Sequence, residues 1–241
     1  DTIVFRLISE NKYQEALWRL KDCGFDSEAD RLEDWMMKYV LNTEFITDSK
    51  LLGGGFTTTK LVTIRPDDME IPGIMSHAPT IYGVWKPKPK VSIFNLQSLK
   101  DGLVSNHRKE VAAYRLDRLL HLNHVPLTKP ILYEYQEGSI QYFITDVVSA
   151  RDMNEFNIHK PKQSGKFDPS KGPRSYLPRG IKLFDYLIDN RDRNLDNYLI
   201  STLDQRIILI DHSWTFQTPF IVDELDHHDN AFLRSIIPNE Q

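Results

Sequence analysis

The most constraining feature of the sequence is a run of acidic and amide side chains between a predicted helix and two short apolar strands. The strands are expected at residues 198 to 201 and 206 to 210, after the polar run. Asp211 ends the second strand. A loop, strand, turn and strand in this order would bring Asp192, Asn197 and Asp211 close to one point.

These side chain types suit phosphoryl transfer. One carboxylate can orient an attacking hydroxyl group and accept its proton, while an amide oxygen and a second carboxylate can hold Mg²⁺, a hard cation that prefers oxygen ligands. Asn197 follows Asp192 at the spacing found between the Asp and Asn of kinase catalytic loops, and Asp211 stands where the next metal-binding Asp is found. The same residues also fit a solvated polar turn capped by short Asp and Asn side chains.

A second element combines a strand lysine with a helix glutamate. Residues 80 to 86 form a predicted strand ended by Pro87, and residues 107 to 122 form a predicted amphipathic helix with Glu110 near its start. Lys86, at the end of the strand, can reach phosphate oxygens if an acid such as Glu110 holds it in place. Taken separately, Lys86 also fits a surface strand end, and Glu110 fits a favourable charge in a first helical turn.

Three glycines, Gly53, Gly54 and Gly55, separate two further predicted strands. Glycines allow backbone amides to approach phosphate groups closely, so this turn is a candidate phosphate contact. The pattern is not G-x-G-x-x-G, and a plain hairpin turn is the alternative interpretation.

The remaining segments give an α+β pattern without regular βαβ alternation. Residues 2 to 41 are predicted to be helical, with a helical hairpin over residues 11 to 41 that we expect to pack on the main domain. A β-hairpin is predicted from residues 131 to 135 and 140 to 148, with its turn at Glu137-Gly138.

Composition limits the possible partners and compartments. A net charge of -4 argues against binding to nucleic acid through bulk charge, and no apolar run reaches the roughly 20 residues that a membrane-spanning helix needs. The single cysteine, Cys23, excludes an intrachain disulfide and slightly favours the cytoplasm, without fixing the compartment. The basic loop at residues 159 to 174 could contact an acidic protein or make a peripheral contact with anionic lipid headgroups, or it could simply be solvated.

The ordered set of motifs resembles the atypical kinases. The matching segments are Gly-Val-Trp-Lys-Pro at 83 to 87, Glu-Val-Ala-Ala-Tyr-Arg-Leu-Asp-Arg-Leu-Leu at 110 to 120, Val-Pro at 125 to 126, Asp-Arg-Asn-Leu-Asp-Asn at 192 to 197, and the segment around Asp211. These segments are similar to the type II phosphatidylinositol 4-kinases and the Golgi casein-kinase-like secretory kinases of the phosphatidylinositol 3-/4-kinase-like superfamily, and more distantly to HipA-like kinases. His212 and Ser213 depart from the pattern, which usually has a glycine two positions after the Asp, and the disulfide cysteines of the secretory kinases are missing.

The resemblance covers about residues 45 to 216 and implies a two-lobed protein-kinase-like fold with ATP between the lobes. The expected organisation is an N-terminal helical segment at residues 1 to 42, an N-lobe with hinge at 43 to 148, and a minimal C-lobe at 149 to 241. The implied cofactors are ATP and Mg²⁺ or Mn²⁺.

The resemblance also implies a role for each candidate residue. Lys86 would contact the α- and β-phosphates and take part in catalysis, and Glu110 would hold Lys86. The other implied roles are nucleotide binding by Gly53, Gly54, Gly55 and the hinge residues Thr145 and Val147, catalytic base for Asp192, and metal ligands for Asn197 and Asp211.

The expected function is therefore an ATP- and Mg-dependent phosphotransferase acting on a hydroxyl group. A protein acceptor is preferred because residues 110 to 120 are most similar to the secretory kinases, and a phosphoinositide acceptor is the alternative, given Lys86-Pro87-Lys88 and the basic loop. A pseudokinase or scaffold, with residues 1 to 41 docking a partner, is the hypothesis from a different class. Transfer of a nucleotidyl group or activation of a carboxylate by a kinase fold also stays open.

Overall fold

The structure is a computed structural model that describes residues 2–52, 58–66, 80–88, 106–152, 179–190 and 192–216. Three predicted features lie outside these ranges: the glycine turn at Gly53 to Gly55, the basic loop at residues 159 to 174, and the C-terminal part of the expected C-lobe from residue 217 onward.

The chain begins with three short helices, as the apolar spacing of residues 2 to 41 predicts. They are α1 (Thr2–Ser9), α2 (Tyr13–Asp22) and α3 (Asp26–Trp35), and the last continues into the π-helical turn η1 (Met36–Val40). Gly24, with φ of +75°, provides the left-handed residue that ends α2. Among the helices that the structure describes, none has the length and apolarity to cross a bilayer.

A five-stranded antiparallel sheet follows, in the order β1-β2-β3-β5-β4. A 3₁₀ turn, η2 (Thr43–Phe45), leads into it. Its strands are β1 (Ile46–Leu51), β2 (Lys60–Ile64), β3 (Ile81–Pro87), β4 (Thr128–Tyr133) and β5 (Gln136–Tyr142). Helix α5 (His107–Leu119) is inserted between β3 and β4, and the Asn106 side chain caps it by accepting a hydrogen bond from the Arg108 backbone N at 2.9 Å.

The turn predicted at Glu137-Gly138 is wrong, because the β4–β5 turn is formed by Glu134 and Tyr135. Both turn residues have positive φ, +50° and +59°, as a two-residue hairpin turn requires. Gly138 instead lies within β5, paired with Ile131 on one side and Pro87 on the other. The glycine marks a close approach between strands, since a Cβ there would come within 2.5 Å of a backbone oxygen of β3.

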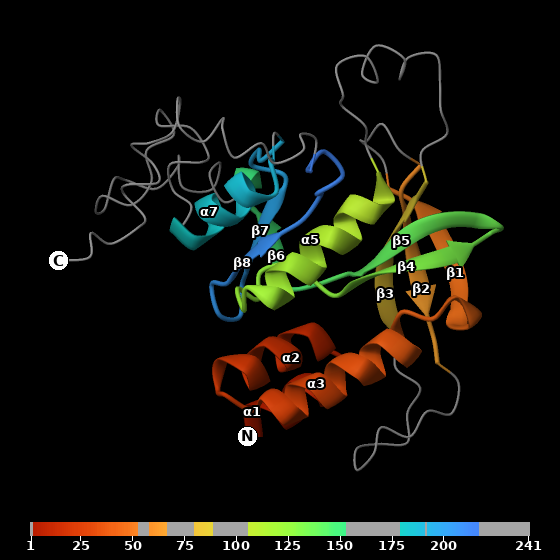
Figure 1. Ribbon diagram of the computed structural model, residues 1–241. Helices are drawn as coiled ribbons and strands as arrows, with labels where there is room; N and C mark the ends of the chain where they lie inside the picture. The colour runs from red at the N-terminus through yellow and green to blue at the C-terminus, as the bar shows by residue number, and fades with distance from the viewer. Residues whose placement is uncertain are drawn as a thin grey trace, which may run out of the picture.

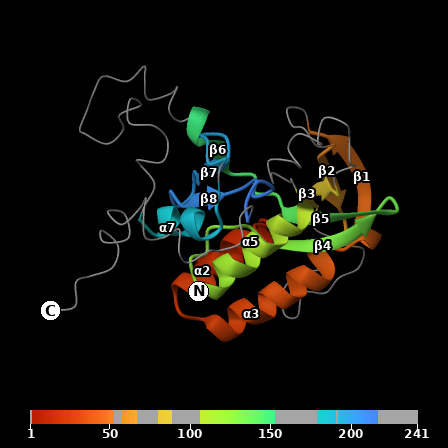
Figure 2. The same ribbon diagram turned by 45° about the horizontal axis from the view of Figure 1, so that its top comes forward.

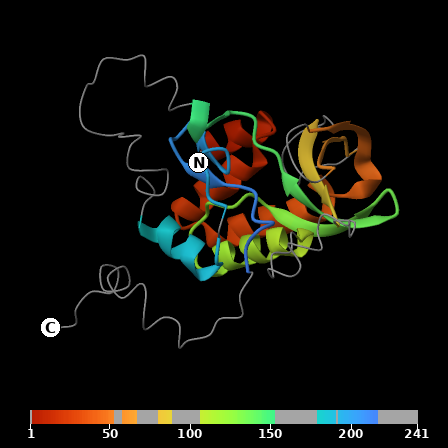
Figure 3. The ribbon, with the colours of Figure 1, turned by 90° about the horizontal axis from the view of Figure 1, so that it is seen from above.

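The second half of the predicted hairpin, residues 140 to 148, is also not one strand. Strand β5 ends at Tyr142, and β6 (Val147–Ser149) belongs to a separate three-stranded sheet of order β6-β7-β8. The other members are β7 (Tyr198–Ser201) and β8 (Ile207–Leu209), and α7 (Arg179–Leu187) precedes them. Figure 3 shows the extended segment that leads from the larger sheet to the smaller one.

The two sheets lie at opposite ends of the described structure, with α5 extending between them and α3 running beside α5 (Figures 1 and 2). Glu33 of α3 accepts hydrogen bonds from the Tyr114 hydroxyl and from Arg118 Nε of α5, the latter at 2.8 Å. Asp22 of α2 forms an ion pair with Arg206 beside the smaller sheet. These contacts, together with a buried apolar core to which the helices and both sheets contribute, attach the N-terminal helices to the rest of the chain.

Replacing Gly138 by Ala is expected to destabilise the fold by about 1–3 kcal/mol, because overpacking forces neighbouring atoms to move. The added Cβ would lie 2.5 Å from the Lys86 carbonyl oxygen and 2.7 Å from Trp85 Nε1. Urea unfolding measures the change. Gly180→Ala in α7 is the control: its Cβ has only Leu122 at 3.9 Å, so that helix should become slightly more stable. A neutral Gly138→Ala variant would contradict the observed strand packing.

Glu15 of α2 should make stability depend on pH. Its Oε2 atom is buried without a hydrogen-bond partner among the described residues, and burial raises the pKa of this carboxyl from 4.5 to about 7. The folded state therefore binds more protons than the unfolded state between these pH values, so stability falls as pH rises through this window, by up to about 3 kcal/mol.

The isosteric change Glu15→Gln removes this ionisation and should flatten the decline. We expect the variant to be more stable than the wild type at pH 8 and similar to it at pH 4.5, as measured by urea unfolding across this range. Glu28→Gln, on the exposed part of α3, is the matched control. Equal pH slopes for the wild type and Glu15→Gln would rule out a buried, titrating Glu15.

Candidate active site

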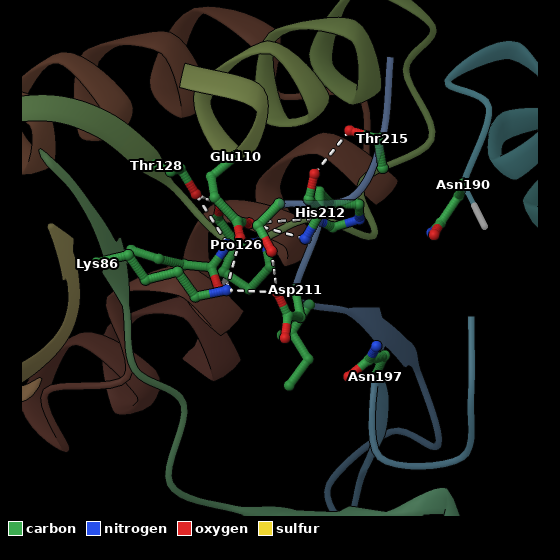
Figure 4. Close-up of polar contacts among 12 residues, drawn as sticks. Lys86, Glu110, Pro126, Thr128, Asn190, Asn197, Asp211, His212 and Thr215 are labelled. Carbon is green, nitrogen blue, oxygen red and sulfur yellow. Dashed lines mark hydrogen bonds and ion pairs between the residues drawn. The ribbon is translucent and has the colours of Figure 1, made fainter. Parts of the chain in front are cut away.

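Three charged side chains from distant parts of the chain meet at one point (Figure 4). Lys86 Nζ donates hydrogen bonds to Glu110 Oε1 at 2.5 Å and to Asp211 Oδ1 at 2.9 Å. Lys86 comes from β3, where burial alternates along the strand, so its side chain lies on the face opposite to the buried Trp85. Glu110 lies in the first turn of α5, and Asp211 follows β8.

The two carboxylates keep the Lys86 ammonium charged although it is removed from water. Burial alone would lower the pKa of Lys86, but the charges of Glu110 and Asp211 outweigh burial and raise it. Burial likewise favours a neutral Glu110, yet the charge of Lys86 and the neighbouring His212 hold the pKa of Glu110 well below its usual range. The side chains of Lys86 and Glu110 are 16% and 2% exposed, whereas that of Asp211 is 40% exposed, so Asp211 forms the open side of this cluster.

Asp211 has an unusual backbone conformation, and only one of its carboxylate oxygens is hydrogen-bonded to described residues. The residue has φ of +56°, a left-handed conformation that is uncommon for residues other than glycine and that often occurs at functional sites. Its Oδ1 atom accepts hydrogen bonds from both Lys86 and Ser213 Oγ, each at 2.9 Å. No hydrogen bond from another described residue reaches Oδ2, which therefore has its acceptor capacity available.

Asp192 and Asn197, in the loop between α7 and β7, are joined to each other. Asn197 Nδ2 donates to the Asp192 backbone oxygen at 2.6 Å and to Asp192 Oδ2 at 3.1 Å, and Asn194 Nδ2 donates to Asp192 Oδ1 at 3.0 Å. Because a backbone carbonyl can only accept, the network fixes the amide orientation and leaves Asn197 Oδ1 as an acceptor. The backbone N of Ile210 donates to the Asn197 backbone oxygen at 3.1 Å, which places this loop directly beside Asp211.

Asn197 Oδ1 and Asp211 Oδ2 are thus two oxygen atoms without a hydrogen-bond partner in the described part of the chain. They belong to residues at adjacent ends of paired strands. Carboxylate and amide oxygens suit Mg²⁺, which usually takes only one or two carboxylates from the protein and completes its coordination with water and phosphate oxygens. The described residues contain no cluster of three or more His, Cys, Asp or Glu that could hold a metal without such help. The donor set therefore fits a divalent cation that arrives with a phosphate ligand.

Two buried residues that the sequence did not identify hold this arrangement together. Arg193, whose side chain is fully buried, forms a two-point ion pair with Asp185 of α7, with Nη2 at 2.9 Å from Oδ1 and Nε at 3.1 Å from Oδ2. Its Nη1 also donates to the backbone oxygens of Asn197 and Ile210. The second is His212, which contacts both Glu110 and Arg193. The only feature of the sequence that pointed to this arrangement was the position of Arg193 between Asp192 and Asn197. A guanidinium that is buried there requires a carboxylate partner.

The proposed hinge residues lie in and next to the connection between the two sheets. Thr145 Oγ1 donates to Asp146 Oδ2 at 3.3 Å and borders a cavity of about 170 Å³ beside α2 and β3. Val147 starts β6 and pairs with Ser201. No hydrogen bond in the described structure joins Thr145 or Val147 to Lys86, so these two residues are positioned by the connection and not by the charged cluster.

The Arg193–Asp185 pair should be the main stabilising contact of the loop. Asp185→Asn leaves a buried guanidinium without its counter-charge and is expected to destabilise the fold by about 3–5 kcal/mol. The control is Asp196→Asn, which removes an exposed ion pair with Arg151 and should cost no more than about 1 kcal/mol. Chemical denaturation of the three proteins measures both changes, and similar values for the two variants would contradict the central role of Arg193.

No protein-family model matches the chain, and no curated protein sequence matches it. Solved structures are similar to it at low identity. A Golgi casein kinase is 18% identical, with a TM-score of 0.46, over 78% of this chain and 57% of the kinase chain, so this chain spans less than two thirds of that protein. A hydra Fam20 protein, solved with a sugar, is 16% identical over 80% of this chain and 69% of the other, with a TM-score of 0.49. The described elements form a mixed helix-and-sheet structure, and its structural neighbours include a kinase. No family assignment follows from similarities this distant.

Proposed function

We propose that this protein is an ATP- and Mg²⁺-dependent phosphotransferase that acts on a hydroxyl group of a protein. The observation that carries the proposal is the meeting of Lys86, Glu110 and Asp211, with Lys86 Nζ at 2.5 Å and 2.9 Å from the two carboxylates. A buried ammonium that is charged, held by one buried acid and shared with one exposed acid, suits binding of a polyphosphate. A structural ion pair would not require the exposed Asp211 or the adjacent Asp192–Asn197 loop.

In this proposal, each residue acts by positioning and by charge. Glu110 fixes Lys86, which donates to phosphate oxygens, and Asn197 Oδ1 and Asp211 Oδ2 hold the divalent cation. The cation neutralises negative charge on the phosphates during transfer. Asp192, whose carboxylate is oriented by the amides of Asn194 and Asn197, accepts the proton of the attacking hydroxyl group. Thr145 and Val147 are proposed to border the adenine, and Gly53 to Gly55 to approach the phosphates.

A protein acceptor is proposed on the similarity of residues 110 to 120 to the secretory kinases. The charged cluster itself would serve any hydroxyl acceptor equally well, because it contacts the phosphate donor. The acceptor therefore has its own experiment: labelled ATP is offered with a mixture of folded proteins and, separately, with phosphoinositide vesicles. Label in protein supports the proposal, and label only in lipid would replace the protein acceptor by a phosphoinositide.

Substitutions at Asp192 and Asp211 separate chemistry from binding. Asp192→Asn should lower the rate of phosphate transfer by about 10²–10⁴-fold while retaining ATP·Mg²⁺ binding, because a base acts only in the chemical step. Asp211→Asn should weaken ATP binding in the presence of Mg²⁺, so that the affinity for ATP depends little on Mg²⁺. Label transfer measures the rate, and calorimetric titration with ATP, with and without Mg²⁺, measures binding.

Lys86→Met and Lys88→Met form a matched pair of lysine substitutions. Lys88 lies two residues beyond Lys86 but is exposed and paired with Glu137, so its loss should leave both measurements unchanged. Lys86→Met should weaken ATP binding and transfer. Wild-type turnover in either Asp variant would show that the roles are wrongly assigned, and ATP binding by a wild type that transfers nothing would point to a nucleotide-binding scaffold.

A further inference from the structure

His212, the residue after Asp211, is fully buried and joins two parts of the site. Its backbone N donates to Glu110 Oε2 at 3.0 Å, and its ring Nε2 lies 3.2 Å from Arg193 Nη2. The ring packs edge-on against Phe184 of α7, with centroids 6.1 Å apart. Thr215 fixes the backbone from the other side, since its hydroxyl donates to the His212 carbonyl oxygen at 2.7 Å. Figure 4 shows the His212 ring close to Glu110 and Asp211.

The contact with Arg193 determines where the ring proton is. A guanidinium carries only donors, so His212 Nε2 must be the acceptor, and the proton of the neutral ring is then on Nδ1. A charged imidazolium does not fit this contact, because it carries a proton on both ring nitrogens and would direct an N–H group at the Arg193 guanidinium.

The Nδ1–H group lies 3.6 Å from Glu110 Oε2 and has no hydrogen-bond partner among the described residues. A buried donor without a partner costs free energy, and a carboxylate is the acceptor that it faces. An inward movement of Glu110 of less than 1 Å would bring the two atoms within hydrogen-bond distance. The same carboxylate already accepts hydrogen bonds from Lys86 and from the His212 backbone.

We propose that His212 is a positioning residue whose Nδ1–H group holds Glu110 when the Lys86 ammonium is shared between Glu110 and phosphate, while its Nε2 atom keeps Arg193 in place. This inference rests on the proposed function, because the Nδ1–H group supplies a further donor to Glu110 once the Lys86 ammonium is shared with a nucleotide. His212 thereby joins the Lys86–Glu110 pair to the loop that carries Asp192 and Asn197.

The tautomer can be tested without any enzyme activity. The experiment uses ¹⁵N-labelled full chain without nucleotide, with His212→Phe to assign the ring signals by their loss. The proposal requires a neutral ring with its proton on Nδ1. A proton on Nε2, or a charged ring at pH 7, would overturn it even if the protein is a kinase. The expected tautomer in a protein without kinase activity would overturn the proposed function alone.

Three substitutions separate the two ring nitrogens. His212→Asn places an amide N–H near the position of Nδ1 and leaves no polar atom at the position of Nε2. Gln places a carbonyl oxygen near Nε2 and loses the Nδ1 donor. Phe fills the volume and keeps the contact with Phe184, but it lacks both nitrogens. Each protein is tested for phosphate transfer from labelled ATP, for ATP·Mg²⁺ affinity by calorimetry, and for its unfolding midpoint.

We expect His212→Phe to lower kcat/KM for ATP by about tenfold or more, because the variant loses one hydrogen bond to a charged group. His212→Asn should recover most of this loss, and His212→Gln should not, although Gln preserves the Arg193 contact. Wild-type kcat/KM in His212→Phe would refute the proposal. If the losses of kcat/KM instead parallel the decreases in the unfolding midpoint, and His212→Asn is no more active than His212→Gln, the ring has only a structural role.

Discussion

The buried ammonium of Lys86 is the group on which the arrangement of this protein depends. A charge removed from water costs several kcal/mol unless charged and hydrogen-bonding partners surround it, and its partners come from α5 and from the end of β8. The larger sheet, the long helix and the smaller sheet must therefore all reach one point. The exposed carboxylate of Asp211 is the only one of the three groups with substantial access to solvent, so a ligand can replace it at Lys86 without uncovering the buried pair.

The loop with Asp192 and Asn197 depends in the same way on the buried guanidinium of Arg193. Arg193 uses its planar donors in three directions, toward Asp185 and toward the backbone oxygens of Asn197 and Ile210. One side chain thus fixes α7, the loop and the strand end beside Asp211. His212 contacts both Arg193 and Glu110, the buried acid that pairs with Lys86, so one residue connects the surroundings of the two buried cations.

The N-terminal helices support the site from outside. Glu33 of α3 pairs with Lys21 at 3.0 Å and with Arg118 of α5, and it accepts the hydroxyl hydrogen bond of Tyr114. Tyr114 and Arg118 lie one and two turns beyond Glu110, so they fix the helix that presents Glu110 to Lys86. These helices are far from the charged cluster in sequence, yet their contacts with α5 restrict how that cluster can move.

The sequence determined the local elements: the helical spacing of residues 2 to 41, the strand that ends at Lys86, the helix that starts near Glu110 and the polar loop before β7. The order of the motifs along the chain was enough to predict that Lys86, Glu110 and Asp211 act at one site. It could not place the β4–β5 turn, because Gly138 is required by the close approach of β3, a contact between strands and not a turn signal. The partners of Arg193 and His212 were likewise decided only by tertiary structure. Hydrophobic periodicity and turn propensity are properties of residues that are close in sequence. The burial and pairing of a charge depend instead on which distant segments the fold brings together.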